Sequence, residues 1–147
     1  MKKHLHTIIS IIIAIFFIYK GIDKFNDSVS ELNKTDLKNI ENEKYIDSPK
    51  GEKPSGYKIT MNTMKQSGFM KMIGMAQILA GILIIIPVSR IYGLLLLLPI
   101  IFNVFMMHLF FDNRIDENIL TGGLLLTNIL LISYYNKLLF KNLILKK

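Results

Sequence analysis

The sequence predicts an all-α integral membrane protein, a four-helix bundle with one long extramembrane loop between its first and second helices. Hydrophobic residues make up 51% of the 147 residues, and they are gathered into four runs. About 20 apolar residues in a helix cross a bilayer core of roughly 30 Å, and a soluble helix is rarely apolar all round. We expect spans at about residues 5–22, 69–88, 91–111 and 119–136, in one membrane domain of residues 1–147.

The first run reads either as a cleaved signal peptide or as a retained transmembrane helix. Both begin with positive charge followed by a short apolar stretch, here "MKKHLHTIISIIIAIFFIYKG". The run continues into Ile22-Asp23-Lys24-Phe25 without a small-x-small cleavage motif. We therefore expect a retained first helix.

The loop of about residues 26–67 is the one long polar segment. Val29, Leu32, Leu37 and Ile40 recur at loosely helical spacing, which indicates a short surface helix between Ser28 and Ile46. The prolines and glycines of Ser48–Tyr57 then indicate an irregular turn. The other two connections, Ser89-Arg90 and Asp112–Asn118, are short.

Flanking charges predict the orientation. With four spans, both termini and the Ser89-Arg90 connection share one face, which carries lysine and arginine but no acidic residue. The positive-inside rule places that face, and so both termini, in the cytoplasm. The net charge of +7 comes without a basic amphipathic element, so we expect contacts with anionic lipid and none with nucleic acid.

Small and polar residues should mark the helix faces that pack together. Lipid tails are as apolar as leucine, so helices associate through close packing and interhelical hydrogen bonds. We expect packing positions at Ala14 in the first span, Gly74 and Gly81 in the second, and Asn128 in the fourth.

The third span contains "LPIIFNVFMMHLFFD", in which Pro99 should kink the helix. His108 and Asp112 are one turn apart, and they either form a structural hydrogen bond or handle protons and bind a ligand. Asn103 and Gln77 likewise either join helices or contact a lipophilic ligand. Lys24 ends the first span, where lysines commonly reach the interface.

Several chemistries are excluded or disfavoured. The chain has no cysteine, so it forms no disulfide and offers no thiolate nucleophile or ligand. A single histidine within the spans indicates neither a zinc site nor a bis-histidine haem, and no metal is expected. The methionines at 61, 64, 70, 72 and 75 favour packing over a copper site.

Three motifs in order resemble the DoxX-like family of small bacterial membrane proteins. They are "YKGIDKF", "GMAQILAGILIIIP" and "LLLLLPIIFNVFMMHLFFD". The resemblance covers roughly 100 residues, excluding most of the long loop and the tail, and it implies a multi-pass protein of the bacterial inner membrane. Some family members are linked to quinone-dependent oxidation of sulfur compounds or to redox-linked membrane complexes. Relatives often carry a glutamate where this chain has Gln77.

The resemblance thus implies an accessory or quinone-interacting subunit of a membrane redox system, with quinone or a redox protein as partner. Catalysis is left open, and a small transporter or channel subunit or a non-catalytic assembly factor are the alternatives. The candidate ligand-binding residues are Gly21, Lys24, Gln77, Asn103, His108 and Asp112.

Overall fold

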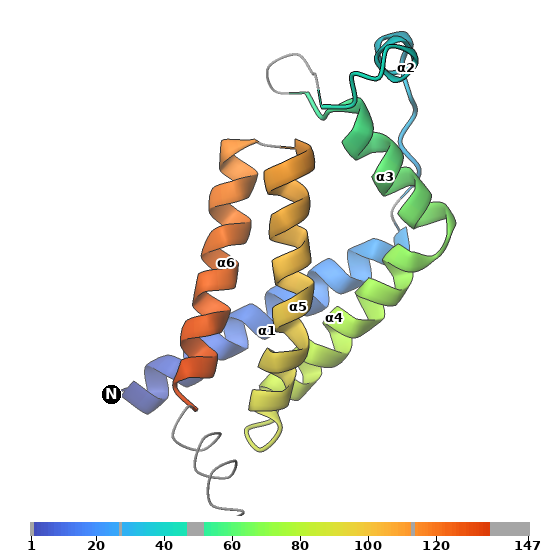
Figure 1. Cartoon of the computed structure of the whole chain (residues 1–147). Helices are drawn as coiled ribbons and strands as arrows, with labels where there is room; N and C mark the ends of the chain where they lie inside the picture. The colour runs from blue at the N-terminus through green and yellow to red at the C-terminus, as the bar shows by residue number, and fades with distance from the viewer. Residues whose placement is uncertain (1, 27, 47–51, 113, 136–147) are drawn as a thin grey trace, which may run out of the picture.

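The computed structural model describes residues 2–26, 28–46, 52–112 and 114–135, and in these ranges the regular elements are all helical (Figure 1). In chain order they are α1 (Lys2–Asn26), α2 (Lys34–Glu41), α3 (Ser55–Gln66), α4 (Phe69–Ile85), α5 (Arg90–Met107), a π-helical turn η1 (His108–Asp112) and α6 (Ile115–Ser133). The predicted end of the fourth span at 136 and the lysines beyond it lie outside these ranges.

Three helical segments are long and apolar enough to cross a membrane: His4–Asn26, Arg90–Asp112 and Ile115–Ser133. The pair α3 and α4 passes the same test together, but the two helices are bent by 78° at the break between them. The prediction of an all-α membrane protein is confirmed, with three spans or with four if the bent pair crosses as one.

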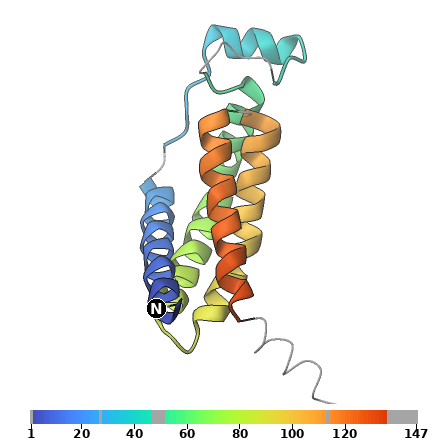
Figure 2. The same ribbon diagram turned by 90° about the vertical axis from the view of Figure 1, so that its left-hand side faces the viewer.

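The bend between α3 and α4 occurs at Gly68, whose φ of 78° lies in the left-handed region. A side chain there would be strained, so glycine suits the position. The polar segment that the sequence predicts as a loop thus contains α2 and all of α3. Figure 2 shows α2 lying across the end of the longer helices.

The helices α1 and α4 run antiparallel in close contact because small residues face each other. A Cβ built on Gly21 would lie 2.7 Å from the Gly74 carbonyl oxygen, and one on Gly74 would lie 2.7 Å from the Gly21 carbonyl oxygen. One on Gly81 would lie 2.9 Å from the carbonyl oxygen of the fully buried Ala14. Larger side chains at these positions would push the two backbones apart.

The next contacts extend this pair in the order α4, α5, α6. Arg90, buried at the start of α5, donates from Nε to the Ile84 carbonyl at 2.9 Å, where a cation suits the C-terminal end of α4. Asn128 of α6 is fully buried and donates to the Leu94 carbonyl of α5 at 3.1 Å. α5 continues through Pro99 from Arg90 to Met107.

The N-terminal end of α1, the α4–α5 turn and the C-terminal end of α6 lie together at one end of the molecule (Figure 1). There α1 and α6 meet, with His6 Nε2 3.3 Å from the Leu131 carbonyl oxygen and its ring stacked on Tyr134. From that contact the two helices diverge, because the α1–α4 pair is tilted against the α5–α6 pair (Figure 1).

Candidate functional site

Two cavities lie toward the other end of the molecule, where the helix pairs have separated. The first, which we call the methionine cavity, has a volume of about 500 Å³ and lies among α3, α4 and α5. It is lined mainly by apolar side chains, including Met61, Met64, Met70, Met72 and Met107.

The second, which we call the lysine cavity, has a volume of about 330 Å³. Its lining comes from α1, α5 and α6, with Gln77 from α4 and with Lys53 and Tyr57 from the start of α3 and the residues before it. Its basic side chains are Lys20, Lys24, Lys53 and Arg114. The two cavities share a wall of four residues, Lys24, Tyr57, Val104 and His108.

The centre of this wall is held by an ion-paired turn. His108 Nδ1 lies 3.0 Å from Asp112 Oδ2, and because a carboxylate only accepts, Nδ1 carries the hydrogen. Arg114 donates to both oxygens of the same carboxylate, at 2.8 Å from Nε to Oδ1 and 2.8 Å from Nη2 to Oδ2. The Asp112 side chain is completely buried by these partners.

The π-helical turn η1 positions this pair. A π turn widens the helix by one residue and often occurs at functional sites. Here it begins at His108 and ends at Asp112, two residues before Arg114, and α6 begins at Ile115. The hydrogen bond to Asp112 and the negative charge of that carboxylate raise the pKa of the Arg114 guanidinium above its ordinary value, although burial opposes this shift. Arg114 therefore stays charged in the lining of the lysine cavity.

The predicted ligand-binding residues fall around both cavities. Lys24 and His108 line both of them, Asn103 lines only the methionine cavity, and Gln77 lines only the lysine cavity. Gly21 lies in the α1–α4 contact, and Asp112 accepts a hydrogen bond from His108. A single site would require Gln77 and Asn103 to line the same cavity, and they line different ones.

Two of the amides differ in how their polar atoms are satisfied. Asn103 donates from Nδ2 to the Pro99 carbonyl within its own helix, at 2.9 Å. Gln77 is only 3% exposed, and its Oε1 is buried without a hydrogen-bond partner among the described residues. A buried acceptor without a donor is costly, so Gln77 is a position where a ligand would restore a lost hydrogen bond.

The sequence did not indicate the contributions of Lys20, Lys53, Tyr57 and Arg114. The Tyr57 ring packs against His108, with ring centroids 5.8 Å apart, and the Lys53 Nζ lies over the Tyr57 ring, 5.6 Å from its centre. Lys53 and Tyr57 are brought to the cavities by the fold of the polar segment. The methionines at 61, 64, 70, 72 and 75 were visible in the sequence, and the first four of them line the methionine cavity, whereas Met75 is exposed.

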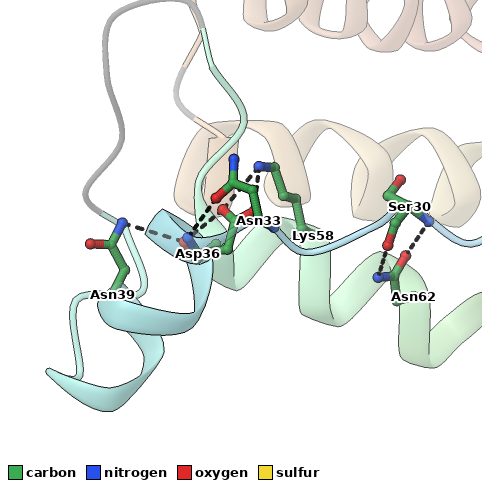
Figure 3. Close-up of polar contacts among 7 residues, drawn as sticks. Ser30, Asn33, Asp36, Asn39, Lys58 and Asn62 are labelled. Carbon is green, nitrogen blue, oxygen red and sulfur yellow. Dashed lines mark hydrogen bonds and ion pairs between the residues drawn. The ribbon is translucent and has the colours of Figure 1, made fainter.

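A polar network joins α2 to α3, the helix that carries Tyr57 (Figure 3). Lys58 Nζ donates to both carboxylate oxygens of the buried Asp36, at 2.9 and 2.8 Å, and Ser55 Oγ donates to Oδ1 at 3.1 Å. Asn62 exchanges two hydrogen bonds with the backbone of Ser30. Burial alone would raise the pKa of Asp36, but the hydrogen bonds, led by that of Lys58, lower it.

Among the residues that the structure describes, no three histidine, aspartate or glutamate side chains are grouped so that they could hold a metal ion. In comparisons with known proteins, no family model matches the chain, and no curated protein or solved structure matches it. The resemblance to DoxX-like proteins therefore depends on the three sequence motifs alone.

Proposed function

We propose that this protein binds a lipophilic small molecule, with quinone as the candidate, and acts as an accessory subunit of a membrane redox system. The observation that carries the proposal is the methionine cavity. Its volume of about 500 Å³ falls within the range of about 300–1,000 Å³ of ligand sites. Its lining is apolar apart from a few polar side chains, among them Lys24, Asn103 and His108, an arrangement typical of sites that orient a lipophilic molecule.

The residues present fit a quinone. A ring would pack among flexible methionine side chains, which adapt to irregular shapes. Its carbonyl oxygens would accept hydrogen bonds from Lys24 or Asn103 at the polar edge. Quinones carry electrons together with protons. Because His108 Nδ1–H faces Asp112, its Nε2 is the ring nitrogen that remains to hold a proton, and the Asp112 carboxylate would stabilise the resulting charge.

The proposal includes a membrane arrangement. The helices α1, α5 and α6 and the bent α3–α4 pair would form a four-helix bundle in the bacterial inner membrane, with both termini on the cytoplasmic side. The packing order α1–α4–α5–α6 and the shared end of α1 and α6 support this arrangement.

The test is to purify the full chain from bacterial membranes in mild detergent and measure co-purified quinone by mass spectrometry. Ala76→Phe would fill the methionine cavity, which Ala76 lines, and should reduce the bound quinone to the background level. Leu130→Phe, at a side chain 62% exposed on α6, is the matched control and should retain it. Wild-type protein without quinone, or equal retention in both variants, would overturn the proposal.

A further inference from the structure

His108 borders both cavities, and one of its ring nitrogens is already engaged. Its Nδ1–H donates to Asp112 at 3.0 Å, and Arg114 donates to both oxygens of the same carboxylate. The Asp112 side chain is completely buried, so it offers no path from the ring to water. Proton exchange by His108 therefore takes place at Nε2, on a ring that lines the methionine cavity and the lysine cavity.

The methionine cavity is poorly suited to bring water to this nitrogen. Its lining consists mainly of methionine and other apolar side chains, and apolar cavities stay dry or hold an apolar ligand. A lipophilic molecule bound there would exclude water further. A proton that His108 exchanges with water therefore has to pass through the other cavity that the ring borders.

The lysine cavity meets both conditions for internal water, which are room and polar partners. Liquid water occupies about 30 Å³ per molecule, so the cavity volume of about 330 Å³ holds several molecules. Polar side chains reach this space from α1, α4 and α6, among them Lys20, Gln77 and Thr121. The Gln77 Oε1 is buried without a hydrogen-bond partner among the described residues, and a water molecule would supply the missing donor.

The polar end of the lysine cavity lies where the helices leave the membrane. Lys53 lines the cavity from the polar segment before α3 and is exposed. Arg114 and Glu117 line it from the connection after the α5 span and from the start of α6, with side chains 24% and 32% exposed. Charged side chains at the ends of spans lie in the interface, where water is present. Water outside the bilayer therefore meets the cavity at this end.

We infer that the lysine cavity is a water-filled route through which His108 exchanges protons for the ligand site. His108 would give a proton from Nε2 to a ligand oxygen in the methionine cavity, which breaks an N–H bond and forms an O–H bond. It would then regain a hydrated proton from the lysine cavity. Only protons move in these steps, and the electrons that reduce a quinone come from the redox partner. The inference rests on the proposed function for the ligand that receives the proton.

Charged and titratable groups approach His108 from several of the described elements. They are Lys24 on α1, Lys53 and Tyr57 at the start of α3, Asp112 in η1, Arg114 beyond it and Glu117 on α6. All of them are retained in the variants described below. Those variants therefore change the access of water to the ring and leave the charged groups around it in place.

The test is hydrogen–deuterium exchange at the imidazole Cε1 of each histidine, measured by mass spectrometry on the full chain in detergent at one pH. Cε1 adjoins Nε2 and exchanges only where water reaches the ring. Leu120→Trp fills the lysine cavity from a residue 53% exposed, and it should slow exchange at His108 about threefold or more. Ala76→Phe fills the methionine cavity and should leave the His108 rate unchanged. The exposed His4 is the internal reference.

A second variant keeps the result interpretable if tryptophan disturbs folding. Thr121→Leu removes a hydroxyl that donates to the Glu117 carbonyl within α6, and it adds an apolar side chain to the cavity wall. It should also slow exchange at His108, whereas the exposed Leu130→Phe on the same helix should exchange as the wild type does. Circular dichroism should be the same for all of these variants.

Three outcomes would overturn the inference: no exchange at His108 in the wild type, an unchanged rate in both lysine-cavity variants, or equal slowing by Ala76→Phe. Bound quinone is measured on the same samples, and the lysine-cavity variants should retain it. A wild type without quinone would overturn the proposed function, whereas the exchange rates would still decide whether water reaches His108 through the lysine cavity.

Discussion

Gly74 is a residue where the packing of α1 against α4 tolerates little change. An added Cβ would lie 2.7 Å from a backbone carbonyl, which has no flexible end that can move away. Gly123 on α6 offers a contrast, because a Cβ there meets nothing within 4 Å. The two glycines therefore have different reasons to be present, one steric and one not.

Gly74→Ala should lower the free energy of unfolding by about 1–3 kcal/mol through overpacking. Gly123→Ala should leave it unchanged or raise it by up to about 1 kcal/mol, since alanine favours the helix. Thermal unfolding in one detergent, followed by circular dichroism, compares the two variants. Equal melting temperatures would show that the α1–α4 contact is looser than described.

His108 and Asp112 show what residue spacing reveals and what it leaves out. Their one-turn separation indicated a pair, and their side chains are 3.0 Å apart. Spacing gave no sign that Arg114 would turn back to the same carboxylate, because that contact depends on the helix ending at η1. From the sequence, Arg114 was only one residue of the short connection Asp112–Asn118.

At the scale of elements, the α2–α3 network should make the polar segment sensitive to acid. The pKa of Asp36 lies below its ordinary value of 3.8, since the hydrogen bonds outweigh burial. A lowered pKa stabilises the folded form fully above the unfolded value, and this stability is lost as the pH falls through the folded value. We expect α2 to detach from α3 below about pH 4.

The Gly56 amide reports this change, because it donates to the Tyr45 carbonyl across the junction at 2.8 Å. Its NMR chemical shift should move as the pH falls from about 6 to about 2. In Asp36→Asn the junction should be weakened at every pH and this titration should disappear. Glu31→Gln, at an exposed carboxylate, is the control and should titrate like the wild type. An unchanged titration in Asp36→Asn would contradict the assignment.

The elements differ in how far the sequence predicts them. Hydropathy located α1, α5 and α6 closely, because long apolar runs leave few alternatives to a membrane helix. It did not show that α3 would be helical, since Ser55–Gln66 mixes polar and apolar residues and is too polar on average to read as a membrane span. The bend at Gly68 was not predicted either, because hydropathy gives no information on the backbone angle φ, which is positive at this glycine. Tyr57 and Lys53 reach the cavities through these unpredicted elements.

At the scale of the whole molecule, the bent α3–α4 pair decides the topology. If α4 crosses the membrane, the α4–α5 turn and the polar segment lie on opposite sides. If the pair is re-entrant, they lie on the same side. The absence of cysteine makes the two cases separable by single cysteine substitutions.

Thr35→Cys in α2 should react with a membrane-impermeant maleimide in intact bacterial cells without an outer membrane. Val88→Cys, at a position 89% exposed in the α4–α5 turn, should react only after permeabilisation. The cysteine-free parent gives the background. Labelling of both positions from outside would place α4 in the membrane as a re-entrant segment and would contradict four crossings.

The wall of Lys24, Tyr57, Val104 and His108 belongs to both cavities. A molecule on one side that shifts the Tyr57 ring or the Lys24 ammonium changes the free energy of binding on the other. Thermodynamic reciprocity then requires each ligand to alter the affinity of its neighbour by the same factor. Any group that fills the lysine cavity would therefore alter the affinity of the methionine cavity for the lipophilic molecule proposed above, and the freedom of these four side chains to move would set the size of that effect.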